Sequence, residues 1–155
     1  MGIQQVLFKD LGVMDYQAAW DYQEKLLQEN VVKKSGVRSQ QLEIQGMPSD
    51  HRPPTSLTET QHYLLFTEHP PVFTLGKSGN KENVLLNEEG LMAKNIQFFN
   101  TNRGGDITFH GPGQIVGYPI LDLEKFYTDI GKYLRNLEEV IILAMAEYGL
   151  RGERS

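Results

Sequence analysis

Cysteine is absent from this sequence of 155 residues. A chain without thiols forms no disulfide, no Cys-based zinc or iron–sulfur site and no thiolate nucleophile. Long hydrophobic runs are absent too, since no stretch approaches the roughly 18 consecutive apolar residues of a membrane span. Residues 1–6 lack the basic and then apolar pattern of a signal peptide. We therefore expect a cytoplasmic protein that does not enter a membrane.

Positive charge is scarce. The chain has 15 Lys and Arg residues against 20 Asp and Glu residues, which gives a formal net charge of −5. Binding to the phosphates of a nucleic acid requires a basic face, so nucleic acid is not an expected partner. The length fits one domain, and a chain of this size buries roughly 68–70% of its unfolded surface, enough for a core without disulfides.

Two long helices are predicted from helical spacing of apolar residues. The first begins after Asp15 as N-cap and ends at Ser35-Gly36. The second covers residues 130–148, with Thr128 as N-cap and Gly149-Leu150 as a Schellman-type ending. A shorter helix is expected around residues 88–94.

Runs of β-branched and aromatic residues predict the strands. They cover residues 3–8, 63–67, 72–75, 96–99, 106–110 and 114–121. The last two are joined by Gly111-Pro112-Gly113, which predicts a turn, and residues 45–60 form a loop. Strands and helices in this order indicate an α/β or α+β fold with one central sheet.

Familiar catalytic motifs are missing. Gly76-Lys77-Ser78 resembles the end of a phosphate-binding loop, but that motif needs a glycine where Pro71 stands. The four histidines have neither zincin spacing nor cysteine partners, so we expect no metal site. No Gly-x-Ser-x-Gly motif marks a serine hydrolase.

The segment from Arg103 to Tyr118 concentrates groups suited to binding. Five glycines lie between positions 104 and 117 in a region of predicted strands. Such glycines allow a ligand or another backbone to approach closely, and the paired N–H groups of Gly104 and Gly105 can hold an oxygen or an anion. Arg103 suits a carboxylate or phosphate. The alternative is a tight β-hairpin whose glycines serve only its turns, with a half-buried, hydrogen-bonded His110. Spacing alone leaves both interpretations open.

This segment resembles the signature of the lipoyl(octanoyl) transferases, the family that starts lipoate attachment. The signature has Arg-Gly-Gly, two residues, Thr, an aromatic residue, His, two residues, Gly-Gln, and Tyr four positions after Gln. The matching positions are Arg103, Gly104, Gly105, Thr108, Phe109, His110, Gly113, Gln114 and Tyr118. Residues 68–76 also resemble the strand that precedes the pocket in this family.

The resemblance implies the fold of the biotin and lipoate protein ligases, a mixed central sheet flanked by helices, with no cofactor. It implies transfer of an octanoyl group from acyl carrier protein to a lysine of lipoyl domains, in 2-oxoacid dehydrogenases and in the glycine cleavage H protein. The implied substrate-binding residues are Arg103, Gly104, Gly105, Asp106, Ile107, Thr108, Phe109 and His110. Among them, the glycine N–H groups make polar contacts, Ile107 and Phe109 pack around the pocket, and Arg103 and His110 orient the thioester or the carrier.

The catalytic pair implied by the resemblance is a cysteine, which takes up the acyl group, and a lysine, which lowers the pKa of its thiol. Both belong to the C-terminal part of family members, and Lys77, Lys125 and Lys132 do not match that lysine. We therefore expect residues 1–155 to be a single acyltransferase domain that lacks its C-terminal part, binds substrate and is inactive by the cysteine route.

Two alternatives follow from the same residues. The first is a non-catalytic module that binds acyl groups or their carrier. The second, a ligase that activates lipoate or biotin with ATP, is disfavoured because the glycine segment matches the transferase pattern. An acidic carrier protein would need a local basic surface, for which Lys77, Lys81 and Arg103 are the candidates.

Overall fold

The computed structural model describes residues 3–44 and 59–154. The chain divides into two compact units, one of Gln5–Leu121 and one of Asp122–Ser155 with Met1–Gln4. The predicted loop at residues 45–60 lies almost entirely outside the described residues. All of the predicted substrate-binding residues belong to the first unit.

The strands of the first unit form two three-stranded sheets. One sheet has the order β1-β2-β6, with β1 (Val6–Val13) parallel to β2 (His62–Glu68) and β6 (Val116–Ile120) antiparallel to β2. The other has the order β4-β3-β5, with β4 (Gln97–Asn100) parallel to β3 (Val72–Leu75) and β5 (Ile107–His110) antiparallel to β3. The predicted mixed α/β fold is confirmed, but its strands are divided between two sheets instead of forming one.

The turn at Gly111-Pro112-Gly113 therefore does not close a hairpin, because β5 and β6 pair with strands of different sheets. Pro70 and Pro71 lie between β2 and β3, which also belong to different sheets. Proline has no N–H group to continue the hydrogen bonding of a strand, so β2 ends before these residues. The first strand also differs from its prediction at residues 3–8. Pairing with β2, from Val6 opposite His62 to Val13 opposite Glu68, extends β1 through polar residues that carry no local strand signal.

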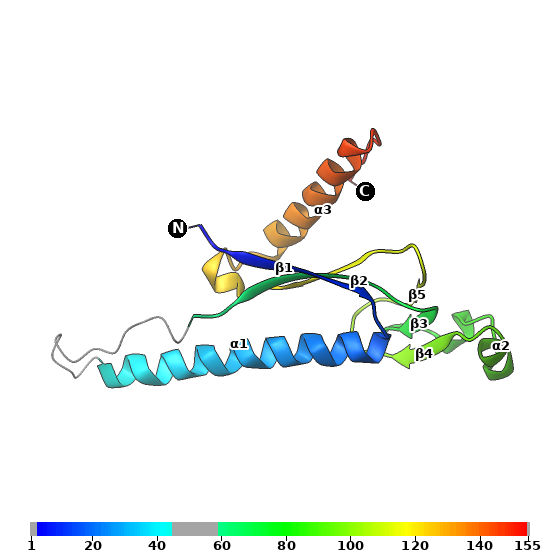
Figure 1. Ribbon diagram of the computed structural model, residues 1–155, viewed down its shortest axis with the longest axis horizontal. Helices are drawn as coiled ribbons and strands as arrows, with labels where there is room; N and C mark the ends of the chain where they lie inside the picture. Colours follow the sequence, from blue (N-terminus) through cyan, green and yellow to red (C-terminus); the bar gives the residue numbers. More distant parts are fainter. Residues whose placement is uncertain (1–2, 45–58, 155) are drawn as a thin grey trace. The chain divides into compact units, whose positions relative to one another are not determined.

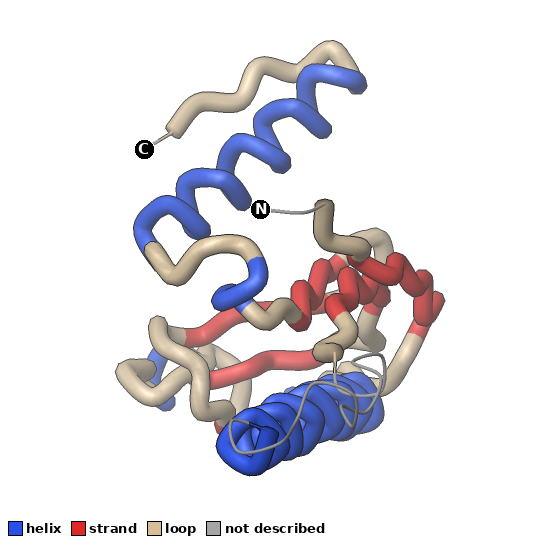
Figure 2. Tube along the Cα trace, turned by 90° about the vertical axis from the view of Figure 1, so that its left-hand side faces the viewer, coloured by secondary structure: helices blue, strands red, loops and turns tan. Residues whose placement is uncertain are grey.

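Helix α1 (Tyr16–Ile44) lies along the β1-β2-β6 sheet (Figures 1 and 2). The predicted cap is confirmed, because Asp15 Oδ1 accepts from the N–H groups of Gln17 at 2.9 Å and Ala18 at 3.3 Å. The predicted end at Ser35-Gly36 is wrong. Ser35 Oγ donates to the Val31 carbonyl within the helix at 2.9 Å, and one glycine costs a helix only about 1 kcal/mol.

Helix α1 packs on the β1-β2-β6 sheet, and its N-terminal end contacts the β4-β3-β5 sheet. Leu26, Leu65 and Ile120 are buried together, one from α1 and two from the sheet. At the N-terminal end of α1, the Tyr16 ring lies 5.2 Å from that of Phe99 in β4, and Gln97 Nε2 donates to Asp15 Oδ2 at 2.8 Å. Residues far apart in the chain thus meet at one end of α1.

A short segment connects β3 to β4. It contains the 3-10 helix η3 (Lys81–Asn83) and helix α2 (Glu88–Ala93). Helix α2 lies at its predicted position, with Asn87 as N-cap accepting from Gly90 N–H at 2.9 Å.

The second unit contains the 3-10 helix η4 (Leu123–Lys125) and helix α3 (Ile130–Glu147). The cap of α3 is Asp129, not the predicted Thr128, since Asp129 Oδ1 accepts from Lys132 N–H at 2.9 Å. The Schellman ending is confirmed. Gly149, at φ +72°, donates to the Ala146 carbonyl at 2.9 Å, and Leu150 donates to that of Met145 at 3.0 Å. No helix among the described residues is both long and apolar enough to cross a membrane.

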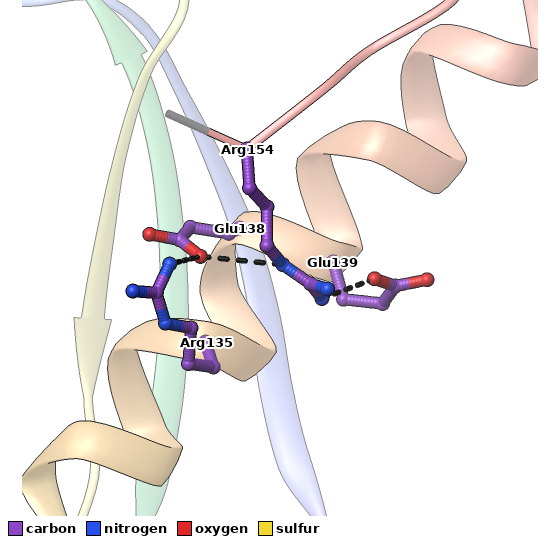
Figure 3. Close-up of polar contacts among 4 residues, drawn as sticks. All are labelled: Arg135, Glu138, Glu139 and Arg154. Atoms are coloured by element: carbon purple, nitrogen blue, oxygen red, sulfur yellow. Dashed lines mark hydrogen bonds and ion pairs between the residues drawn. The ribbon is translucent and has the colours of Figure 1, made fainter.

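After α3 the chain folds back along the helix, as Figure 3 shows through the contacts of Arg154. Its guanidinium contacts Glu138 Oε2 at 3.3 Å and also pairs with Glu139, and Arg135 Nη1 lies 2.7 Å from Glu138 Oε2. These side chains are largely exposed, so each pair contributes at most about 1 kcal/mol.

Candidate functional site

The predicted site residues divide between the two faces of the β4-β3-β5 sheet. Thr74 pairs with Thr108 and Val72 pairs with His110, so Thr74, Thr108 and His110 share one face. Phe109 lies on the other face, where its ring centroid is 5.1 Å from that of Phe73. Ile107 shares the face of Phe109 because side chains alternate along a strand. The structure therefore separates the polar members of the predicted set from the apolar ones.

Arg103 binds the protein's own backbone. Its Nη2 donates to the Thr74 carbonyl at 2.7 Å, to Thr74 Oγ1 at 2.9 Å and to the Asp106 carbonyl at 3.0 Å. Its Nη1 donates to the Gly104 carbonyl at 2.9 Å. Thr74 is fully buried, so the guanidinium satisfies polar atoms that water does not reach. Arg103 thus holds residues 103–106 against β3.

Gly76 packs directly against the glycine pair. A Cβ atom at this position would lie 2.3 Å from the Gly105 carbonyl oxygen and 2.8 Å from that of Gly104. Hydrogen bonds hold the two segments together, from Gly76 N–H to the Asp106 carbonyl at 3.1 Å and from Lys77 N–H to the Arg103 carbonyl at 2.9 Å. The sequence signals for Gly76 were its place at the end of a predicted strand and in residues 68–76, which resemble the family's strand before the pocket.

Asp106 anchors the other side of the same segment. Its Oδ1 accepts from Asn80 N–H at 3.1 Å, and its Oδ2 accepts from Asn83 Nδ2. The N–H groups of Gly104 and Gly105 have no hydrogen-bond partner within the described ranges, and both residues are exposed. Two consecutive unpaired N–H groups on an anchored backbone can donate to a carbonyl oxygen or an anion.

A cluster of rings covers the face that carries His110. The Tyr16 ring stacks on that of His110, with centroids 6.3 Å apart and planes at 13°. It also meets His69 edge-on at 5.3 Å. His69 itself lies 5.9 Å from His110. The cluster joins α1, the turn after β2, and β5.

His69 is fully buried and has a defined tautomer. Its Nδ1 lies 2.8 Å from the Met14 carbonyl, which only accepts, so Nδ1 carries the proton. Its Nε2 lies 2.8 Å from Tyr118 Oη and therefore accepts from that hydroxyl. Burial lowers the pKa of His69 below 6.5, and burial also raises the pKa of Tyr118 to about 12. Sequence reasoning missed His69, although Glu68-His69-Pro70-Pro71 lies in the segment that resembles the family.

The lowered pKa of His69 predicts a loss of stability in mild acid. Between the folded-state pKa and 6.5, the unfolded chain binds a proton at His69 that the folded chain does not bind. The free energy of unfolding should therefore fall as the pH drops below about 6.5. Urea unfolding at about pH 7.5 and about pH 5 measures this change. A His69→Gln variant should lose less stability over this interval, and an equal loss in both proteins would contradict the assignment.

Metal ligands do not gather at this site. Within the part of the chain that the structure describes, no three His, Asp or Glu side chains lie as they would around a metal ion. The glycine N–H pair and the His110 ring instead suit hydrogen bonding to an organic substrate.

Comparison with known protein families decides which fold family this site belongs to. Residues 15–155 match the model of the lipoyl protein ligase A/B catalytic domain. The chain belongs to this family. The match contains both sheets of the first unit apart from β1, and all of residues 103–110.

Curated relatives are similar over nearly the whole chain. The octanoyltransferase of Flavobacterium johnsoniae is 55% identical over 98% of this chain, and that of Christiangramia forsetii is 53% identical over 98%. The octanoyltransferase of Flavobacterium psychrophilum is 54% identical over 97%. These matches cover 60%, 59% and 59% of the respective relatives, so the chain spans about three-fifths of the length of the proteins it matches.

Proposed function

We propose that this chain provides the substrate-binding part of an octanoyltransferase of lipoate biosynthesis. The reaction moves an octanoyl group from acyl carrier protein to a lysine of lipoyl domains. The observation that supports this most strongly is the identity of 53–55% to proteins named octanoyltransferase across 97–98% of the chain.

The geometry of residues 103–106 suits an acyl thioester. The N–H groups of Gly104 and Gly105 are exposed and unpaired among the described residues, so they can donate to the thioester carbonyl oxygen. Arg103 and Asp106 keep this backbone in place through their contacts with Thr74, Asn80 and Asn83. Donors held in place before the substrate arrives need no reorganisation on binding.

The remaining predicted residues are assigned to the same function. Thr108 and His110 lie on the polar face of the sheet, and Ile107 and Phe109 provide apolar surface on the opposite face. Lys77 and Lys81 are both exposed and border the segment that Asp106 anchors. They provide positive charge for an acidic carrier protein, which improves the rate of encounter more than the affinity.

The chemistry of transfer requires a nucleophile that this chain does not contain, since it has no cysteine. We therefore expect binding of the octanoyl carrier without turnover. The absence of cysteine is also compatible with the second candidate function, a non-catalytic module that binds acyl groups or their carrier. Both functions use the same site, and neither predicts octanoyl-lysine from this chain alone. They differ in whether the site serves transfer once a catalytic cysteine and lysine are supplied.

A transfer and binding assay tests the proposal. Octanoyl-acyl carrier protein is incubated with the chain and a lipoyl domain. The masses of the chain and of the lipoyl domain are then measured by mass spectrometry. We expect no octanoyl adduct on either, and tighter binding of the octanoyl carrier than of the carrier without an acyl group. The Flavobacterium johnsoniae octanoyltransferase is the positive control.

Each other outcome is informative. Equal binding of acylated and unacylated carrier would contradict the assignment of substrate binding. Octanoyl-lysine in the lipoyl domain would contradict the expected inactivity. Release of pyrophosphate from ATP on addition of octanoate would instead identify the chain as a ligase.

A further inference from the structure

The turn after β5 brings the Gln114 side chain to His110. Residues 111–114 form a turn closed by a hydrogen bond from Gln114 N–H to the Gly111 carbonyl at 3.1 Å. Gly113 adopts a φ of +82° there, and its N–H donates to Glu68 Oε2 at 2.8 Å. The backbone that carries Gln114 is therefore anchored to the end of β2.

His110 and Gln114 form a direct hydrogen bond. Gln114 Oε1 lies 2.5 Å from His110 Nδ1. An amide oxygen only accepts, so His110 Nδ1 donates and carries the proton of the neutral ring. The hydrogen bond at one ring nitrogen determines which nitrogen is protonated, so Nε2 is left with a lone pair.

The orientation of the His110 ring is also determined. Tyr16 stacks against one of its faces, and His69 approaches it edge-on. Its Nε2 has no hydrogen-bond partner among residues 3–44 and 59–154. Because no side-chain nitrogen or oxygen among these residues is both buried and unpaired, Nε2 is not completely buried.

We propose that Gln114 is a positioning residue that holds His110 as the Nδ1–H tautomer, so that His110 Nε2 accepts a hydrogen bond from an N–H group of the substrate. This inference rests on the proposed octanoyl transfer. Two N–H sources occur in that reaction, the amides of the pantetheine arm that carries the octanoyl group and the amine of the acceptor lysine. Each of the two sources can donate an N–H hydrogen bond to His110 Nε2.

The tautomer itself is measured without any substrate. Imidazole nitrogens with and without a proton have different ¹⁵N chemical shifts, and a His110→Gln variant assigns the signals. We expect the wild-type chain to show a protonated Nδ1 and an unprotonated Nε2 at neutral pH. A protonated Nε2 as the main form would overturn the proposal.

Substitution at Gln114 tests its role. Gln114→Leu removes the acceptor, so both tautomers of His110 should be populated, and Gln114→Glu keeps an acceptor oxygen and should preserve Nδ1–H. Gln17→Leu changes another exposed glutamine of the first unit and should leave the signals unchanged. An unchanged tautomer in Gln114→Leu would overturn the proposal, since Gln114 would not be its cause.

The substrate side is tested on the same signals. Octanoyl-pantetheine offers amide N–H groups but no amine, and butylamine offers the amine of a lysine side chain but no amide. A shift of the Nε2 signal by the first ligand identifies the carrier arm as the donor, and a shift by the second identifies the acceptor lysine. No shift with either at saturating concentration would overturn the assignment of Nε2. Because the tautomer is measured separately, failure of the proposed function remains distinguishable from failure of the role of Gln114.

Discussion

Replacing Gly76 with alanine is expected to lower the free energy of unfolding by about 2–3 kcal/mol and to abolish binding of the octanoyl carrier. The added Cβ would lie 2.3 Å from the Gly105 carbonyl oxygen and 2.8 Å from that of Gly104. Both atoms belong to the backbone, so no side-chain rotation relieves the contact. Relief requires residues 103–106 to move away from β3 and break the hydrogen bonds of Gly76 and Lys77.

Urea unfolding and carrier binding measure the two effects of this substitution. Gly104→Ala is the matched control for stability, because it makes the same chemical change in the facing segment. A Cβ at Gly104 meets nothing within 4 Å, and the residue has no positive φ. We expect its free energy of unfolding to stay close to that of the wild type. Equal stabilities of Gly76→Ala and the wild type would show that the two segments do not touch in solution.

Replacing Arg103 with alanine is expected to cost about 3 kcal/mol of stability, and replacing it with lysine should recover only part of this. Alanine leaves the buried Thr74 carbonyl and hydroxyl without the charged donor that satisfies them. Leaving a buried polar group unpaired costs about 1–3 kcal/mol. Lysine has no planar fork, so it cannot reach the carbonyls of Thr74, Gly104 and Asp106 together.

The control for Arg103 is an exposed arginine. Arg135 pairs with Glu138 on the surface of α3, and Arg135→Ala should cost less than about 1 kcal/mol. Urea unfolding of the three variants gives the comparison. If Arg103→Ala costs no more than Arg135→Ala, the guanidinium does not hold the loop. If Arg103→Lys is as stable as the wild type, the charge matters and the planar geometry does not.

The helices show how far local patterns predict this fold. The cap at Asp15, the position of α2 and the Schellman ending at Gly149 are all confirmed, because each depends on residues within one or two turns. The predictions for the end of α1 and for the cap of α3 are wrong, because several neighbouring residues could end or cap each helix. Asp129 and Thr128 are both acceptable caps, and only the backbone path determines which one reaches Lys132 N–H.

The candidate site shows the same division. The signature from Arg103 to Tyr118 already identifies the segment by its residue types. The partners of these residues come from other parts of the chain, so their roles depend on the fold. Thr74 is 29 positions from Arg103, His69 is 55 from Met14, and Tyr118 is 49 from His69. No periodic pattern links residues at such separations.

By itself, the sequence determined the mixed α/β class, the helices and the glycine segment with its family resemblance. These follow from periodicity, capping and residue order, which act over a few positions. Only the tertiary structure decided that the strands form two sheets, that Gly76 supports the glycine pair, and that Arg103 binds the backbone of Thr74. Strand pairing and close packing bring together residues distant in the chain, and their free energy depends on the whole fold, not on any local segment.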